Sequence, residues 1–290
     1  MKEVQKRRLG ILAGKGELPW LAVRSAQQAG EDVRVFTFTD EPPPAEFVNI
    51  TQPVILTKVF TSVMRSMKKE NVDRLILLGK ATRSILYDNP RFDLRSLFLV
   101  ARMASQSDYS LFDYVSREFE KSGIKIIEQT TYLSHLFLGK GRYGKKCTTK
   151  ELQDVVFGMI HAREINRLDI GQALVVGNKS VLAVECAEGT DNCIKRGGHL
   201  FHKKGASVCK VAKINHDLRF DVPVTGVSTL ESMKEAGCRV LAIEASCTFV
   251  LHHSEFVRTA KKYGITILAL DPEKADLAAL KKLNSKEIKI

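Results

Sequence analysis

Apolar runs typical of buried strands alternate with segments of helical spacing in the first half of the chain. The runs lie at 8–13, 33–39, 73–78 and 124–128, and the helical segments between them include 20–29, 57–69, 94–103 and 110–121. Parallel strands need crossover connections, usually helices, and a parallel sheet buries both of its faces. The pattern therefore predicts an N-terminal Rossmann-like layered α/β domain with a largely parallel sheet.

The second half of the chain shows the same alternation. Its apolar runs lie at 173–176, 181–184, 206–213, 239–244 and 265–270, and its helical segments at 149–168, 191–203, 228–236 and 254–263. These elements predict a second α/β domain, for which we expect a mixed sheet. The predicted fold class is thus α/β with two domains.

A stretch rich in glycine and cations separates the two halves. Residues 138–146 contain three glycines and four cations, a composition typical of linkers. We therefore expect a nucleotide-side domain at 1–138, a linker at 139–148, a catalytic domain at 149–275 and a basic tail at 276–290. The lysine-rich tail is expected to fray.

Charge and cysteine content narrow the class of protein. The chain has 290 residues and a formal net charge of +12, which points to nucleic acid, anionic membranes or phosphorylated ligands unless the surface is simply solvated. Its six cysteines form no C-x-x-C pair, which disfavours a zinc site or a disulfide framework. The N-terminal residues do not resemble a signal peptide, and no apolar run approaches the roughly 20 residues that span a bilayer.

Glycines follow the first predicted strand. Gly14 and Gly16 precede a helical segment, as in folds where backbone N–H groups bind a phosphate. Pro19 stands where a dinucleotide fingerprint has its third glycine, so a turn that merely starts a helix explains the motif as well. Lys80 and Arg83 follow the strand at 73–78, where they either contact a phosphate or lie in a solvated loop.

Four acids follow strand-like runs in the second half of the chain: Glu185, Glu188, Asp191 and Asp221. Carboxylates near glycine, threonine and arginine at strand ends are typical of sites for a hard metal ion and a phosphate. A plainer interpretation makes Asp191 or Thr190 a helix N-cap. Asp221 has apolar neighbours, so its carboxylate is either hydrogen-bonded to backbone or a ligand. Arg219 beside it is either its ion-pair partner or a clamp for a phosphate.

Spacing alone supports a two-domain α/β protein that binds phosphate. Five motifs, however, occur in order along the chain: GILAGKGELP at 10–19, GKATR at 79–83, LDIGQ at 168–172, ECAEGTD at 185–191 and DLRFDVP at 217–223. Together they resemble the LpxI-type UDP-2,3-diacylglucosamine pyrophosphatases of lipid A biosynthesis. The similarity covers nearly the whole chain, to about residue 270, and the C-terminal motifs are the specific ones.

The resemblance implies an enzyme whose substrate binds in the cleft between two α/β domains. The reaction implied is hydrolysis of UDP-2,3-diacylglucosamine to 2,3-diacylglucosamine 1-phosphate (lipid X) and UMP, with Mg²⁺ or another divalent cation such as Mn²⁺. The family's essential aspartate maps onto Asp221, with Asp191 as a rival. The chain departs from the family at His216, where the family has Gln, and at Asn192 and Cys193, where Ala-Met is common.

The expected site residues follow from these motifs. Catalytic roles are expected for Asp221, Asp191 and Arg219. Metal coordination is expected from Asp221, Glu185, Glu188 and Asp191. Substrate binding is expected from Gly14, Gly16, Lys80, Arg83, Gln172, Thr190 and Lys213.

Expected partners and location follow from the implied substrate. The enzyme should be cytoplasmic and meet its lipid-linked UDP-sugar at the inner membrane surface, because a basic protein is attracted to an anionic bilayer. Nucleic acid is not expected as a partner, and the assembly is either a monomer or a homodimer. Two helical or loop clusters are candidates for receiving the acyl chains, with core packing as the plainer interpretation: Leu94, Leu97, Phe98 and Ala101, and Leu133, Leu136 and Phe137.

Two other functions remain open at this point. The net charge and the glycine turn fit a non-catalytic nucleotide- or nucleic-acid-binding protein, although four acids would repel a polyphosphate unless a metal intervened. A nicotinamide-dependent oxidoreductase would use Gly14, Gly16 and Asp40, but Pro19 counts against it.

Overall fold

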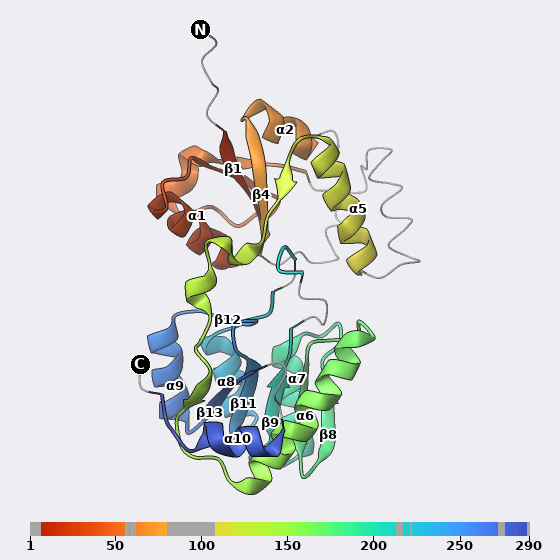
Figure 1. The fold of residues 1–290 in the computed structure, drawn as a ribbon, viewed down its shortest axis with the longest axis vertical. Coiled ribbons are helices and arrows are strands. Elements are labelled where there is room, and N and C mark those ends of the chain that lie inside the picture. Colours follow the sequence, from red (N-terminus) through yellow and green to blue (C-terminus); the bar gives the residue numbers. More distant parts are fainter. Residues whose placement is uncertain are drawn as a thin grey trace. The chain divides into compact units, whose positions relative to one another are not determined.

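The computed structural model describes residues 7–55, 58, 62–79, 108–202, 204–212, 217–220, 222–271 and 276–288. The chain forms two compact units, each with its own sheet (Figure 1). The first unit comprises Met1–Leu133 and Leu218–Phe220, and the second comprises Ser134–Asp217 and Asp221–Ile290. The predicted class, α/β with two domains, is confirmed. In the described part of the chain no helix has the length and apolar character needed to cross a membrane.

The first unit is built on a five-stranded parallel sheet in the order β3-β2-β1-β4-β5. Its elements are β1 (Arg8–Ala13), α1 (Leu18–Gln28), β2 (Val33–Thr37), η1 (Ala45–Ile50), β3 (Thr51–Pro53), α2 (Met64–Lys69), β4 (Val72–Leu78), α5 (Asp108–Lys121), β5 (Lys125–Ile126) and η4 (Gln129–Thr131). The chain runs from β1 outward to β3 and then returns to β4 on the other side of β1. The carboxyl ends of β1 and β4 therefore form the switch point where open α/β sheets bind ligands.

Both faces of this sheet are buried. Leu12, Phe36 and Leu75 pack in one apolar cluster with side chains of α2 and α5, while helix α1 contacts β1 and β2. Because side chains alternate along a strand, Ile11 and Val35 point to the opposite face, and both are fully buried. Burial on both faces produces the continuous apolar runs from which the parallel sheet was predicted. The helix predicted at 94–103 lies outside the described residues.

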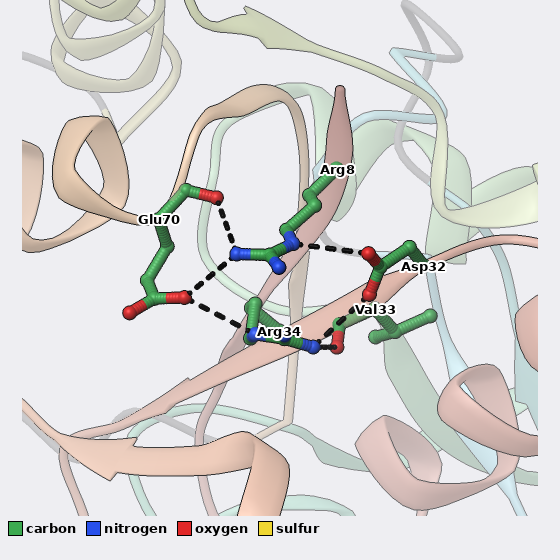
Figure 2. A network of polar contacts seen from close by, with 5 residues as sticks. All are labelled: Arg8, Asp32, Val33, Arg34 and Glu70. Atoms are coloured by element: carbon green, nitrogen blue, oxygen red, sulfur yellow. Dashed lines mark hydrogen bonds and ion pairs between the residues drawn. The ribbon is translucent and has the colours of Figure 1, made fainter. Parts of the chain in front are cut away.

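A closed ring of charges joins the amino ends of three strands in the first unit (Figure 2). Arg8 binds Asp32 and Glu70 at 3.0 Å each, and Arg34 binds the same two acids at 3.0 Å and 3.2 Å. Each of the four side chains is only 23–30% exposed. Partly buried networks of this kind stabilise more than isolated surface pairs. The ring therefore ties β1, β2 and β4 together at the edge opposite their carboxyl ends.

The second unit is built on a mixed six-stranded sheet in the order β6-β13-β11-β9-β7-β8, as expected. Its elements are η5 (Ser134–Leu136), β6 (Gly141–Tyr143), α6 (Thr149–Arg167), β7 (Ala173–Gly177), β8 (Ser180–Val184), α7 (Thr190–Leu200), β9 (Ser207–Lys210), β10 (Val224–Thr225), α8 (Val227–Glu235), β11 (Val240–Glu244), β12 (Phe249–Val250), α9 (His253–Tyr263), β13 (Thr266–Leu270) and α10 (Leu277–Asn284). Strands β9, β11 and β13 are parallel, whereas β6, β7 and β8 pair antiparallel to their neighbours. Strands β10 and β12 form a separate parallel pair.

Helices cover both faces of the second sheet (Figure 1). Leu241 and Ile243 of β11 pack with side chains of α7, α8 and α9. Their neighbours Val240 and Ala242 pack on the other face, with side chains of α6 and α10. The strand alternation thus divides one sheet between two apolar clusters.

In place of the expected linker at 139–148, the structure has a strand and a helix cap. Strand β6 pairs with β13 at the edge of the second sheet, and Tyr143 is buried. A Cβ atom on Gly141 would lie 2.4 Å from the side chain of Ile288, so this glycine permits close packing rather than flexibility. Thr148 caps α6 through a capping box with Glu151.

The basic tail at 276–290, which was expected to fray, contains the ordered helix α10. Leu280 is 1% exposed and packs in the cluster with α6. The Asn284 side chain also hydrogen-bonds to both the N–H and the carbonyl oxygen of Cys147, each at 2.9 Å. The apolar positions of the tail therefore complete the core of the second unit.

Candidate functional site

One edge of the second sheet gathers polar side chains from three parts of the chain. The parallel strands β9 and β11 end at Lys210 and Glu244. Strand β7 is antiparallel to β9, so it begins at this same edge, where Ala173 pairs with Lys210. Gln172 precedes β7 and accepts a backbone hydrogen bond from Val211 at 2.9 Å. Loops at the carboxyl ends of parallel strands are where α/β proteins most often place functional residues.

A chain of hydrogen bonds links three side chains at this edge of the sheet. The Lys210 ammonium donates to Thr190 Oγ1 at 2.9 Å, and the Thr190 hydroxyl donates to Glu185 Oε1 at 2.6 Å. Thr190 is the first residue of α7, and Gly189 before it has a positive φ of 81°, a conformation that favours glycine. Lys210 is only 6% exposed. The structure therefore holds an ammonium group and a carboxylate on either side of one threonine hydroxyl.

The backbone of Glu185 is held in place as well. Its N–H donates to the carbonyl oxygen of Ala173 at 2.9 Å, and a Cβ atom on Gly171 would lie 2.0 Å from the Glu185 carbonyl oxygen. A side chain at 171 would thus push Glu185 away. Within the described part of the chain, its second carboxylate oxygen, Oε2, is buried without a hydrogen-bond partner. Such an oxygen is available to a donor or a cation.

Glu244 is a site residue that the sequence analysis missed. It is 3% exposed, and its Oε1 accepts two N–H bonds from Arg163, at 3.1 Å and 3.0 Å. Its Oε2 accepts the N–H of Ala212 at 2.8 Å, which fixes the chain just after β9. An acid that closes an otherwise apolar strand was the signal that could have revealed it.

The remaining predicted acids of this region do not converge with Glu185. Glu188 binds Arg196, and this bond holds the pKa of the Glu188 carboxyl below its usual value. Asp191 lies exposed in the first turn of α7. Among the residues that the structure describes, no three His, Cys, Asp or Glu side chains are grouped to hold a metal ion. Asp221 and Lys213 lie outside the described residues.

In the first unit, the predicted Gly14 lies against Gly79 at the switch point of the sheet. The Gly14 N–H donates to the Leu78 carbonyl oxygen at 2.7 Å, and a Cβ atom on Gly79 would lie 2.7–2.9 Å from Gly14 backbone atoms. Gly16 has a φ of 99°, and its N–H donates to the Glu41 carboxylate at 3.2 Å. Both of these N–H groups are therefore engaged within the protein, and the glycines allow the carboxyl ends of β1 and β4 to approach closely at the switch point. Lys80 and Arg83 lie outside the described residues.

Arg219 is grouped with the first unit rather than with the acids of the second. Its guanidinium lies 5.5 Å from the ring centroid of Phe112 and 3.9 Å from the Glu120 carboxylate.

The expected acyl-contact residues that the structure describes pack inside the protein. Leu133 and Leu136 are buried, and Phe137 stacks on Phe249 at 5.0 Å. Residues 94–101 are outside the described part of the chain.

Family models match both units of the chain. A model described as the LpxI N-terminal domain matches residues 8–136, and one described as the LpxI C-terminal domain matches residues 139–268. A relative from Caulobacter vibrioides, named UDP-2,3-diacylglucosamine pyrophosphatase LpxI, is 30% identical over 284 residues. This alignment covers 92% of the chain and 99% of the relative. The resemblance found in the sequence motifs is confirmed.

Proposed function

Because the chain belongs to the LpxI family, we propose that it hydrolyses UDP-2,3-diacylglucosamine to 2,3-diacylglucosamine 1-phosphate (lipid X) and UMP in lipid A biosynthesis. The observation that carries this proposal is the match of both family models, one for each α/β unit. The relative from Caulobacter vibrioides is named for this substrate and aligns along nearly its whole length.

To catalyse this hydrolysis, the protein must neutralise charge on the substrate rather than form a covalent bond with it. Water adds to one phosphorus atom, the bond from that phosphorus to the bridging oxygen breaks, and the bridging oxygen leaves with the other phosphate. Negative charge therefore grows on phosphate oxygens in the transition state, where positioned cations are effective. Asp221 is proposed to accept the proton of the attacking water or to hold a cation, as the resemblance implies.

A divalent cation is part of the proposal, and one described carboxylate fits it. Glu185 Oε2 is buried and without a hydrogen-bond partner among the described residues, and carboxylate oxygen is the ligand that a hard cation takes. Glu188 is held by Arg196 and fits less well. We propose Glu185 and Asp221 as the ligands. A cation bound there would withdraw charge from the pyrophosphate.

The proposed substrate also accounts for the basic surface of the chain. Its two acyl chains are embedded in a bilayer, and a net charge of +12 would draw the enzyme to anionic headgroups. We therefore propose transient contact with the membrane surface during catalysis.

The purified chain and UDP-2,3-diacylglucosamine in mixed micelles test the proposal. UMP release should depend on enzyme concentration, stop when EDTA is added and recover when Mg²⁺ or Mn²⁺ is added back. UDP-glucosamine without acyl chains should be a poorer substrate, because each buried methylene is worth about 0.8 kcal/mol. Tight binding of nucleotide or DNA without any turnover would instead favour a binding protein.

A further inference from the structure

Lys210 is a buried cation that the sequence motifs did not assign to the site. It closes β9 and is 6% exposed, and lysines are almost never fully buried unless their charge is paired. Its Nζ donates to Thr190 Oγ1 at 2.9 Å. This bond fixes the direction of the Lys210 side chain at the carboxyl edge of the sheet.

The hydroxyl of the threonine between Lys210 and Glu185 has a defined hydrogen-bond direction. A hydroxyl has one proton to donate, and that of Thr190 goes to Glu185 Oε1 at 2.6 Å. Its oxygen is then oriented to accept from Lys210. A hydrogen bond to a charged group is shorter and stronger than a neutral one, so the carboxylate orders the hydroxyl and the hydroxyl orders the ammonium.

We propose that Lys210 binds a phosphate oxygen of the substrate, and that Thr190 and Glu185 are positioning residues that fix its ammonium group. This inference rests on the proposed function and names a group that carries out part of it. Lys210 lies at the carboxyl edge of the sheet beside Gln172, Glu185 and the first turn of α7, where substrate contacts are expected from the sequence motifs. Pyrophosphate is an anion whose charge shifts during hydrolysis, and a lysine acts on such a group as a point charge.

The scale of the effect follows from preorganisation. Removing one positioned donor that stabilises transition-state charge typically costs about 10²–10³ in kcat. Loss of a residue that only orders this donor should cost less, on the order of tenfold, because the ammonium can still reach the phosphate with lower probability. A lysine that served stability alone would change the melting temperature and leave kcat and KM unaltered.

Four variants separate these roles. Lys210→Met keeps the apolar stem and removes the charge, and it should lower kcat/KM by about 10²–10³. Thr190→Val should lower kcat about tenfold, whereas Thr190→Ser, which restores the hydroxyl, should stay close to the wild type. The double variant Lys210→Met/Thr190→Val should be little worse than Lys210→Met, since residues that act through one another are not additive.

A matched control lies at the opposite edge of the same sheet. Thr266 begins β13, is 2% exposed and donates its hydroxyl to the Lys145 carbonyl oxygen at 2.8 Å. Thr266→Val should lower the melting temperature without changing kcat or KM. If Lys210→Met does not fold, the difference in kcat between Thr190→Val and Thr190→Ser still tests whether the Thr190 hydroxyl positions Lys210.

The outcomes distinguish this inference from the function on which it rests. Full turnover by folded Lys210→Met, equal turnover of Thr190→Val and Thr190→Ser, or additive losses in the double variant would overturn the inference alone. A wild-type chain that releases no UMP would overturn the proposed function, and the inference with it.

Discussion

The ring of Phe220 stacks on that of Phe112 in α5, with centroids 4.5 Å apart and planes inclined by 16°. Two residues earlier, the Leu218 carbonyl oxygen accepts the N–H of Gln129 at 2.7 Å. The segment Leu218–Phe220 is therefore grouped with the first unit, although the chain on either side of it is grouped with the second. Since Asp221 follows Phe220 directly, the first unit holds the chain one residue before the expected catalytic aspartate.

Loss of this stacking should affect turnover more than stability. Phe220→Leu keeps an apolar side chain and removes an aromatic contact worth about 0.5–1.5 kcal/mol. We expect kcat to fall about tenfold, because a small misplacement of a reacting group can cost roughly 100-fold. Phe47→Leu, which removes the stacking on Trp20 in the same unit, is the control and should change only the melting temperature. Identical kcat values for the two variants would contradict the positioning role.

A methyl group at Gly79 should disturb the switch point of the first sheet. Gly79→Ala must place Cβ within 2.7–2.9 Å of the Gly14 backbone and also adopt a φ near 89°. Gly123→Ala is matched in backbone strain, with a φ near 85°, but its Cβ would meet nothing within 4 Å. Both should lose roughly 1–2 kcal/mol from the left-handed conformation. Gly79→Ala should lose more stability, because its Cβ displaces the Gly14 backbone, and only this variant should also lose affinity for UMP. Titration calorimetry with UMP, beside thermal unfolding, checks this, and equal affinities would exclude a nucleotide role for the turn.

Glu31 should make the stability of the first unit dependent on pH. Hydrogen bonds from Arg74 and then Tyr132 hold the pKa of the Glu31 carboxyl below its ordinary value of 4.5. A carboxyl with a lowered folded-state pKa contributes stability above its unfolded pKa and loses it as the pH falls through the folded pKa. Glu31→Gln should therefore be less stable than the wild type at pH 7, with a difference that narrows below about pH 4. Urea unfolding at both pH values measures it, and a constant difference would contradict the linkage.

Replacement of the two rival aspartates decides which one carries the reaction. Asp221→Asn should lower kcat by roughly 100-fold or more, the scale of losing a key acid–base or electrostatic group. Asp191→Asn should lose less, because Asp191 lies exposed in the first turn of α7. Steady-state UMP release and circular dichroism of both folded variants provide the comparison. A larger loss in Asp191→Asn would transfer the role to that residue.

Local patterns in the sequence predicted the layered fold, because apolar alternation and helix spacing act over a few residues. Glycines were harder to interpret from sequence. Gly141 suggested a linker, but its lack of a side chain makes room for Ile288, a contact between residues far apart in the chain. The same limit applies to α10, whose order depends on the distant residues of α6 and Cys147.

Only part of the candidate site could be predicted from the sequence, because some of its contacts join residues that are far apart in the chain. Thr190 and Glu185 belong to one short motif, and the structure brings them into contact. Lys210 lies inside the strand predicted at 206–213 and Glu244 ends the one predicted at 239–244, so their sequence neighbourhood indicated only strand positions. Their roles depend on Thr190 and Arg163, which reach them through the strand order of the sheet. The pairing of Glu188 with Arg196 likewise depends on how α7 packs beside the loop after β8.

The products formed from UDP-2,3-diacylglucosamine test the central claim most directly. Mass spectrometry of a quenched reaction with the purified wild-type chain should find UMP and 2,3-diacylglucosamine 1-phosphate in equal amounts, both rising linearly with time. Unchanged substrate in the presence of Mg²⁺ or Mn²⁺, or UDP together with the free diacyl sugar, would contradict it.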